Sequence, residues 1–223
     1  MSDSKFDTHN RTQMLETTLG LLDAIEKGDD NLSQRSLAAR LGVALGLTNS
    51  LLKRCMKKGI LKVSKVPARR FAYYLTPKGF SEKSKLTAEY LSYSLKFFRE
   101  ARQQYDEIFE NCAAHGWKRV ALYGTGELAE IATLAAAGTG VELVAIMDPS
   151  RNVFEFCNLP VKASLGELDG DGGVDAVVLT ATKDTQETYL KLINQMDKAR
   201  VLVPDFLFVS SIGDEIEDKA GVA

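Results

Sequence analysis

The sequence predicts an α/β protein with an N-terminal domain of helices and a hairpin, a long connecting helix, and a small C-terminal domain built on a parallel sheet. Three observations support this prediction. Helical spacing in residues 12–58 gives way to two β-type runs, residues 79–114 contain no proline and no internal glycine, and strands alternate with helices after residue 116. Such alternation is typical of a parallel sheet covered by helices. A chain of 223 residues can bury a core in each of two small domains.

Residues 1–78 are expected to form three helices followed by a two-stranded hairpin. Residues that favour helix ends bound the helices: Ser33 is a typical N-cap, and Gly42 and Gly59 suit the turns that end a helix. The order of elements, helix, helix, turn, helix and hairpin, is that of a winged helix-turn-helix. The expected helices span residues 12–27, 34–41 and 44–58, and the expected strands span residues 60–66 and 71–75.

The segment 37–43, Leu-Ala-Ala-Arg-Leu-Gly-Val, and the third helix that follows it resemble the helix-turn-helix of MarR-like winged-helix regulators. The resemblance covers about residues 12–80 and extends to the hairpin and to the exit segment 74–79, Tyr-Leu-Thr-Pro-Lys-Gly. It implies a DNA-binding domain whose third helix enters the major groove.

The charge is divided unevenly along the chain. Residues 1–100 contain 18 Lys or Arg and 10 Asp or Glu, whereas residues 101–223 contain 10 and 20, so the net charge of −2 hides a basic and an acidic half. Between Ser50 and Lys85 eleven residues are basic and one, Glu82, is acidic. A basic first half is typical of a protein that places only that half against double-stranded DNA.

The third helix and the hairpin are expected to contact DNA. The side of the third helix expected to be buried consists of Thr48, Leu51, Leu52 and Cys55. Asn49 and Ser50 then face outward, where they can reach base edges. Leu45 on that face either touches a thymine methyl or packs inside. Basic residues further along the helix suit phosphates, and arginines at the hairpin tip suit a minor groove or a phosphate. The predicted DNA-binding residues are Asn49, Ser50, Lys53, Arg54, Lys57, Lys65, Arg69 and Arg70.

Residues 79–115 are expected to form a long connecting helix. Its apolar residues recur over its whole length, from Leu86 to Cys112, and exceed what a simple linker requires. We expect the helix to pack against its twin in a homodimer; alternatively, it folds back on its own domains.

Residues 116–210 are expected to form a small Rossmann-like domain, followed by a tail, 211–223. The segment around Gly124 and Gly126 reads as a strand, a GxGxxA turn and a helix start. Gly126 lets backbone N–H groups approach a diphosphate. Asp148 closes the second strand, where a carboxylate commonly binds ribose hydroxyls, whereas Glu127 would repel a phosphate. The predicted ligand-binding residues are Gly124, Thr125, Gly126, Glu127, Leu128, Asp148, Thr180, Thr182 and Lys183.

Four short segments of this half, 123–126, 147–148, 158–161 and 175–179, resemble the small Rossmann domains of bacterial polysaccharide epimerase/dehydratases and sugar acyltransferases. The resemblance implies NAD(H) or a nucleotide sugar as ligand. The whole arrangement is similar to winged-helix regulators associated with exopolysaccharide synthesis. It is also similar in layout to the Rex redox repressors, without matching their sequence motifs.

No catalytic set is evident, so we do not expect an enzyme. Tyr189 is followed four residues later by Ile193 rather than by the lysine that short-chain sugar enzymes require. Three scattered cysteines favour reduced thiols over a disulfide or a metal site. The polar segment 1–11 lacks the apolar core of a signal peptide, and no apolar run reaches the ~18–20 residues of a membrane span, so a cytoplasmic protein without a membrane segment is expected.

Three functions remain open from the sequence. The first is a transcriptional regulator that responds to a nucleotide ligand and controls polysaccharide genes. The second is a DNA-binding regulator whose Rossmann-like half only mediates dimerisation or docks a partner. The third is a small nucleotide-sugar enzyme.

Overall fold

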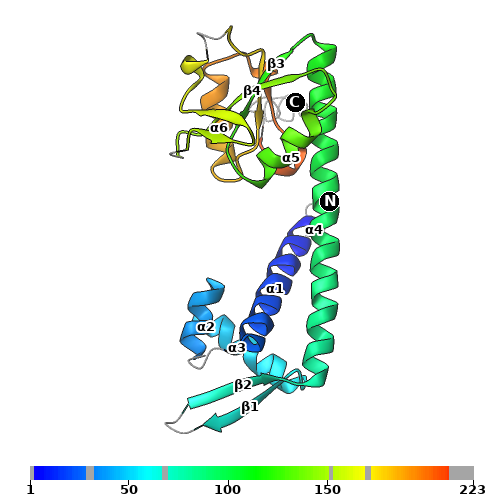
Figure 1. Ribbon diagram of the computed structural model, residues 1–223, viewed down its shortest axis with the longest axis vertical. Helices are drawn as coiled ribbons and strands as arrows, with labels where there is room; N and C mark the ends of the chain where they lie inside the picture. Colours follow the sequence, from blue (N-terminus) through cyan, green and yellow to red (C-terminus); the bar gives the residue numbers. More distant parts are fainter. Residues whose placement is uncertain (1–2, 29–32, 67–69, 151–152, 169–171, 211–223) are drawn as a thin grey trace, which may run out of the picture. The chain divides into compact units, whose positions relative to one another are not determined.

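The computed structural model of the chain describes residues 3–28, 33–66, 70–150, 153–168 and 172–210, with only the backbone described at 3–12, 65–66 and 70–71. The chain divides into two compact units, residues 1–96 and 97–223 (Figure 1). The predicted α/β class, with an N-terminal winged helix-turn-helix and a C-terminal parallel sheet, is confirmed. The domain boundaries expected at residues 78, 115 and 210 stay predictions.

The N-terminal unit contains the predicted three helices and hairpin, followed by the start of a long helix. Two helices begin earlier than expected. The first begins at Asp3 rather than at residue 12, and the long helix begins at Pro77 rather than at Gly79, because proline suits the first turn of a helix. The elements are α1 (Asp3–Glu26), α2 (Gln34–Leu41), α3 (Leu45–Lys57), β1 (Leu61–Val66), β2 (Arg70–Leu75) and α4 (Pro77–Ala114).

The ends of α2 explain how the chain turns into α3. Ser33 is the N-cap, and a reciprocal capping box links its side chain to the backbone N–H of Ser36 and the Ser36 side chain to the backbone of Ser33. At the other end Gly42 adopts φ 63°, the left-handed conformation that ends a helix. The core that holds the three helices together is fully buried at Leu21, Leu22, Leu37 and Leu52.

The end of α3 and the start of α4 meet at a tight junction. The Thr76 hydroxyl lies 2.7 Å from the carbonyl oxygen of Gly59 and 3.1 Å from that of Ile60, and it accepts a hydrogen bond from the Gly79 N–H at 3.0 Å. A Cβ at Gly79 would lie 2.3 Å from the Ile60 oxygen and 2.9 Å from Leu75 Cδ2. Glycine is therefore required in this first helical turn because the backbone of Ile60 occupies the space of a side chain.

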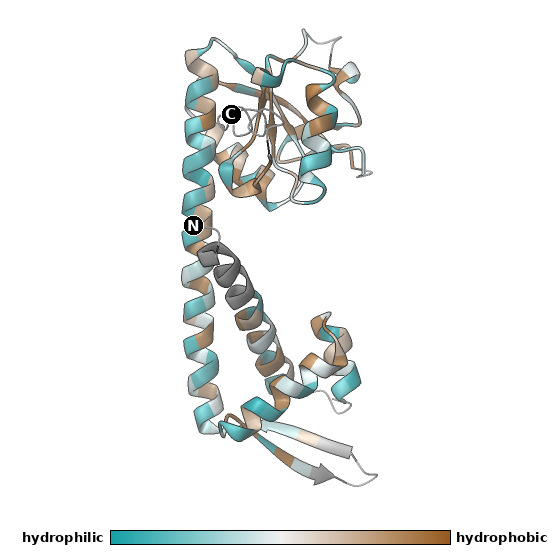
Figure 2. Ribbon diagram, turned by 180° about the vertical axis from the view of Figure 1, so that it is seen from behind, coloured by the Kyte–Doolittle hydropathy of each residue, from teal (hydrophilic) through white to brown (hydrophobic). Residues whose placement is uncertain are grey.

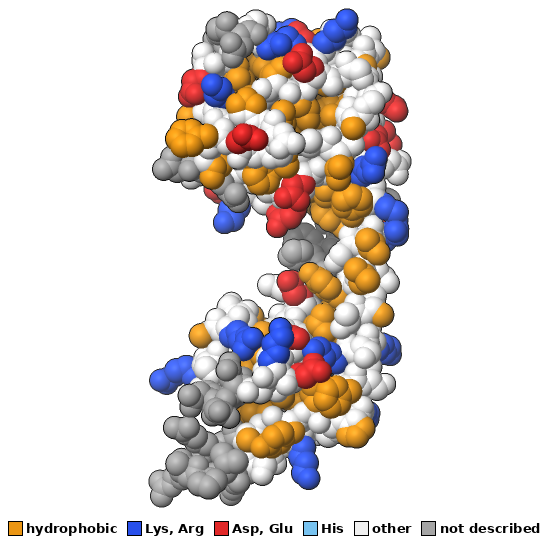
Figure 3. All heavy atoms as spheres, in the orientation of Figure 1, with side chains coloured by type: hydrophobic (Ala, Val, Ile, Leu, Met, Phe, Trp, Pro, Cys, Tyr) orange, Lys and Arg blue, Asp and Glu red, His pale blue; other side chains and the backbone are white. Residues whose placement is uncertain are grey.

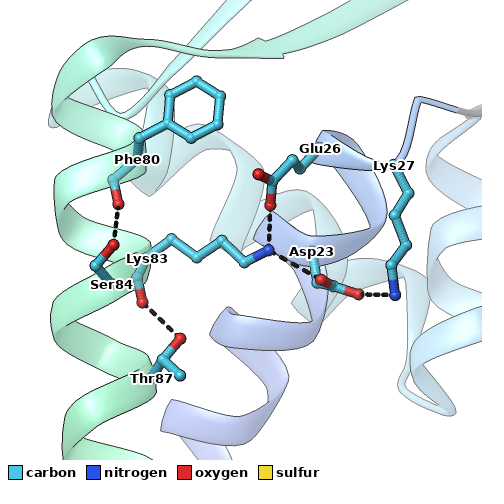
Figure 4. Close-up of polar contacts among 7 residues, drawn as sticks. All are labelled: Asp23, Glu26, Lys27, Phe80, Lys83, Ser84 and Thr87. Atoms are coloured by element: carbon cyan, nitrogen blue, oxygen red, sulfur yellow. Dashed lines mark hydrogen bonds and ion pairs between the residues drawn. The ribbon is translucent and has the colours of Figure 1, made fainter.

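An ion-pair cluster joins α1 to α4 within this unit (Figure 4). The ammonium group of Lys83 donates to Asp23 at 2.9 Å and also contacts the carboxylate of Glu26, while Lys27 pairs with Asp23 at 2.7 Å. Hydrogen bonds from Lys27 and Lys83 lower the pKa of Asp23 to about 2. The contact fixes the first turns of α4 against the last turn of α1.

The C-terminal unit is a six-stranded sheet in the order β5-β6-β4-β3-β7-β8, parallel except for the edge pair β5 and β6. The sequence pattern did not predict the hairpin formed by β5 and β6. The strands are β3 (Arg119–Tyr123), β4 (Glu142–Met147), β5 (Glu155–Phe156), β6 (Leu159–Lys162), β7 (Ala176–Leu179) and β8 (Val201–Leu202), and the helices α5 (Glu127–Ala136) and α6 (Thr185–Ile193).

Both faces of this sheet are buried, and the central strands are strongly hydrophobic (Figure 2). On one face Val120 and Leu122 pack with α5 and with the second half of α4. On the other face Ala121 packs with α6, which contributes Tyr189 and Leu192. The sheet therefore lies between two helical layers, as expected for a parallel sheet.

The second half of α4 belongs to the core of the C-terminal unit. Ala101, Tyr105, Phe109 and Cys112 are fully buried in the cluster on the sheet. For these residues the alternative interpretation, a helix that packs on its own domain, is the correct one. The apolar residues of α4 that remain exposed include Phe80, Leu91, Leu95 and Phe97.

Candidate nucleic-acid interface and ligand site

The buried stripe predicted for α3 is confirmed. Thr48, Leu51, Leu52 and Cys55 are all buried, and the Thr48 hydroxyl lies 3.3 Å from the carbonyl oxygen of Ala44. The side of α3 away from this stripe is exposed to solvent. The predicted DNA-binding residues exposed on it are Ser50, Lys53, Arg54 and Lys57.

Asn49 differs from the other predicted base-reading residues. Its side chain is half-buried, and its amide oxygen is buried without a hydrogen-bond partner among the described residues. Pairing with adenine needs this oxygen to accept from N6. The side chain would have to turn outward before it could read a base.

The hairpin provides a second basic element. Lys65 lies in β1 and Arg70 in β2, where the structure describes only the backbone, and Arg69 lies outside the described residues. Lys62 on β1 is opposite Tyr74 on β2, and both side chains are exposed.

Two arginines that the sequence reasoning did not select lie on α2. Arg35 and Arg40 are both exposed. The sequence could have indicated them, because Leu37 and Ala38 form the buried side of α2 and both arginines fall on its other side. The space-filling view of the N-terminal unit shows Lys and Arg side chains gathered on its surface (Figure 3).

The predicted glycine turn lies at the carboxyl end of β3, between β4 and β7. Gly124 adopts φ 106°, and a Cβ there would lie 2.6 Å from the backbone N and Cα atoms of Ala181. The loop after β7 therefore packs directly on the turn. Thr180 reinforces this contact, because its hydroxyl donates to the Gly124 carbonyl oxygen at 2.6 Å. The order of β4, β3 and β7 makes this the point where the strand order reverses, where open α/β sheets bind ligands.

Both carboxylate oxygens of Asp148 accept hydrogen bonds from residues of the neighbouring turns. One carboxylate oxygen accepts from the Thr125 N–H at 3.0 Å and from its hydroxyl; the other accepts from the Ser150 N–H at 3.0 Å and its hydroxyl at 2.6 Å. Burial raises the pKa of Asp148, but the hydrogen bonds from Ser150 and Thr125 outweigh it, and the net pKa lies below its ordinary value. Ser150 was missed by the sequence reasoning; its place two residues after an aspartate is typical of such a local turn.

The remaining predicted ligand residues divide into buried and exposed ones. Leu128 is buried in the core and Thr180 is buried at the sheet edge, whereas Glu127, Thr182 and Lys183 are exposed. The N-cap of α5, Gly126, supplies no side-chain hydrogen bond, so the first N–H groups of the helix lack a capping side chain. Glu127 and Glu130 place two carboxylates in that turn.

Sequence reasoning also did not predict a contact between α4 and this edge. The Tyr105 hydroxyl on α4 donates to the carbonyl oxygen of Leu179, the residue that ends β7 and precedes Thr180. Burial raises the pKa of Tyr105, which keeps the hydroxyl protonated as a donor.

The described residues contain no group of three or more His, Cys, Asp or Glu side chains placed to hold a metal ion. None of the helices in the described part of the chain is both long and apolar enough to cross a membrane. The cysteines form no disulfide: Cys55 and Cys112 are buried and Cys157 is half-buried.

Residues 14–62 match the model of a family described as winged helix-turn-helix DNA-binding. The N-terminal unit therefore carries a winged helix-turn-helix DNA-binding domain. A search of curated proteins finds no match to the chain.

Several solved structures are similar to the chain. A protein of unknown function from Listeria innocua is 18% identical, with 51% of this chain and 91% of that chain covered and a TM-score of 0.32. RSP, a Rex-family repressor, is 13% identical, with 85% and 80% covered and a TM-score of 0.31. Human N-acetylserotonin methyltransferase is 15% identical, with 88% and 77% covered and a TM-score of 0.32.

Proposed function

We propose that the chain is a transcriptional regulator that binds double-stranded DNA through its winged helix-turn-helix and responds to a nucleotide ligand at the glycine turn of the C-terminal unit. The ligand is NAD(H) or a nucleotide sugar, and the regulated genes serve polysaccharide synthesis, as the resemblance to MarR-like regulators of that type implies. In this proposal the chain is not an enzyme. The observation that carries it is the exposed basic face of α3 within a DNA-binding domain.

The DNA-binding part has a direct test. Binding sites are selected from genomic fragments, and affinity is measured by fluorescence anisotropy at several salt concentrations. Replacing Lys57 by alanine should weaken binding on all sequences and lower the slope of log affinity against log salt by about 1, because one phosphate contact is lost. Lys191→Ala removes the same charge from α6 and is the matched control. Equal slopes for Lys57→Ala and the parent would remove Lys57 from the interface.

The ligand part is supported by the position of the turn. The carboxyl ends of β3 and β7 lie side by side, so Gly126 at the start of α5 and the exposed Thr182 and Lys183 border the same edge. Lys183 can balance the charge of a phosphate that Glu127 and Glu130 would repel. Thr182 offers a hydroxyl to a ribose or sugar.

A thermal-shift screen tests this site with NAD⁺, NADH, NADPH, UDP-sugars, GDP-sugars and CoA. A ligand at ~100 times its dissociation constant adds ~2.7 kcal/mol to the free energy of unfolding. Thr182→Val and Lys183→Ala should abolish the shift of the ligand found, and because both side chains are exposed the fold should survive. Asp148→Ala is a poor probe here because Asp148 holds the turn itself.

The response to the ligand is proposed to pass through α4. Tyr105 ties the second half of α4 to the end of β7, and the same helix begins at the Thr76 junction in the DNA-binding unit. In a homodimer joined by the exposed apolar residues of α4, a change at the turn would alter the spacing of two recognition helices, which must match half-sites about one helical turn apart. Operator affinity that stays the same at saturating ligand would contradict this coupling.

One observation favours a second function, a Rossmann-like unit that only mediates dimerisation or docks a partner. The carboxylate of Asp148, predicted for a ribose, is already satisfied by Thr125 and Ser150. Under this function no nucleotide in the screen shifts the melting temperature, and DNA binding is unaffected by all of them.

A further inference from the structure

The first turn of α3, the helix that carries the exposed basic residues, presents two leucine side chains to solvent. Leu45 is 41% exposed and Leu47 is 37% exposed, and Gly46 lies between them. With 100° between successive residues, Leu45 and Leu47 lie 100° to either side of Gly46, whereas Ser50 and Lys53 lie on the same face as Gly46. A Cβ at Gly46 would have no atom within 4 Å. The packing of the protein therefore does not require a glycine here.

A single exposed leucine needs no explanation, but this pair lies at the leading end of the helix that a DNA-binding domain uses for recognition. The family match spans residues 14–62 and so includes this turn. Basic side chains are exposed elsewhere in the same domain: Arg35 and Arg40 on α2, and Lys53 and Arg54 about two turns further along α3. An apolar protein partner would leave these positive charges without counterparts, whereas DNA is complementary to them.

We infer that Leu45 and Leu47 recognise the C5-methyl groups of thymines in the major groove, and that Gly46 is a glycine so that the helix can approach the base edges closely. The inference rests on the proposed DNA binding and names the sequence class that is read. Among the four bases, only thymine presents an apolar group in the major groove. A leucine side chain offers no hydrogen bond and can discriminate bases through contact with that methyl. The half-site is accordingly rich in thymine opposite the first turn of α3.

Uracil substitution tests the methyl contact alone. Sites are first selected from a random duplex library, and each thymine of the half-site is then replaced by uracil, which keeps the O4 acceptor and removes the methyl. Affinity should fall about fourfold for each contacted methyl, the value of burying one such carbon. Unchanged affinity at every substituted position would overturn the inference. A library that yields no enriched sequence would instead overturn the proposed function.

Two further variants test whether Leu45 and Leu47 are the residues that contact the thymine methyl groups. Leu45→Ala and Leu47→Ala should each reduce the difference in affinity between thymine and uracil sites and leave the salt dependence unchanged. Leu134→Ala on α5 removes an exposed leucine of the C-terminal unit and should leave that difference intact. If the difference between thymine and uracil sites survives in the Leu45→Ala, Leu47→Ala double variant, other residues read the methyl and the assignment is wrong.

Gly46→Ala tests the close approach. The added methyl meets open space within the protein and alanine favours a helix, so the melting temperature should stay the same or rise. Affinity for the selected site should fall at least tenfold, while affinity for unrelated DNA stays within twofold. Equal affinity of parent and variant for the selected site would overturn the role of Gly46.

Discussion

The hydroxyl of Tyr105 on α4 donates to the main-chain oxygen of Leu179, the last residue of β7, at 3.0 Å. Both residues are fully buried. The next residue, Thr180, donates to the carbonyl oxygen of Gly124. Two consecutive hydrogen bonds therefore connect α4 to the glycine turn through the end of one strand.

Tyr105→Phe should lower the free energy of unfolding by about 1 kcal/mol, because the Leu179 oxygen loses a buried partner while the ring keeps its packing. The ring contact with Phe206, at 5.9 Å between centroids, is retained in the variant. Urea denaturation measures the change. Tyr93→Phe, a half-buried tyrosine of α4, is the control. Equal stability of Tyr105→Phe and the parent would show that this hydrogen bond contributes nothing net.

Asp148→Asn should destabilise the chain by about 2 kcal/mol at neutral pH, since hydrogen bonds to a buried carboxylate are lost or weakened. The folded pKa of Asp148 lies below its ordinary value of 3.8. Its contribution is therefore present above that value and is lost as the pH falls through the folded pKa. The difference in free energy of unfolding between parent and variant, measured from pH 7 down to pH 3, should shrink only below about pH 4. Asp205→Asn, which alters an exposed carboxylate of the same unit, is the matched control.

Lys83→Met should raise the pKa of Asp23 from about 2 toward its ordinary 3.8, because a hydrogen bond and a positive charge are removed. The pair is partly exposed, with side-chain exposures of 19% for Lys83 and 38% for Asp23, so the loss of stability should stay below about 1 kcal/mol. The contribution of Asp23 is present above pH 3.8 and is lost as the pH falls toward 2. NMR titration of the carboxyl carbon measures this pKa. Lys85→Met, which removes an exposed charge two residues further along α4, should leave it unchanged.

Gly79→Ala should destabilise the N-terminal unit by about 3 kcal/mol, as expected for a side chain forced against buried backbone. The added Cβ would meet the Ile60 oxygen at 2.3 Å. Thermal or urea unfolding measures the loss. Gly46→Ala, also within a helix but facing open space, is the matched control. Equal free energies of unfolding for the two variants would show that the backbone around Ile60 can move to accommodate a side chain at position 79.

Leu91→Glu with Leu95→Glu should convert a homodimer into a monomer, because two exposed apolar residues of α4 would become charged on the proposed interface. Light scattering coupled to size-exclusion chromatography measures the mass. Leu134→Glu on α5 changes a leucine that is 52% exposed and should leave the mass unchanged. A parent protein that is already monomeric at high concentration would contradict the dimer.

Most of the fold followed from local pattern. The helix α2 has a capping box and a C-cap glycine, and β3, β4 and β7 are apolar runs of typical length, so local pattern predicted them. The hairpin of β5 and β6 was missed because its strands are short and its turn uses Cys157 and Asn158 at φ 53° and 60° rather than glycine. Asparagine tolerates this conformation and was the available signal.

The sites were predicted less completely because they depend on contacts between distant segments. Periodicity separated the buried and exposed faces of α3, yet it did not reveal that the Asn49 oxygen turns inward. The strand-end position of Asp148 was correct, but its partners Thr125 and Ser150 could be identified only from the folded turn. The hydrogen bond from Tyr105 spans 74 residues of sequence, and no local pattern indicates it.

The junction at Thr76 gives the DNA-binding unit a stiff corner. With the Gly59 and Ile60 carbonyl oxygens beside the Thr76 hydroxyl and no room for a side chain at Gly79, the end of α3 and the start of α4 cannot pivot independently. We therefore expect a rotation of the first turn of α4 to move the recognition helix with it. The junction would then couple the orientation of α3 to that of α4, and this coupling depends on how rigid the junction is.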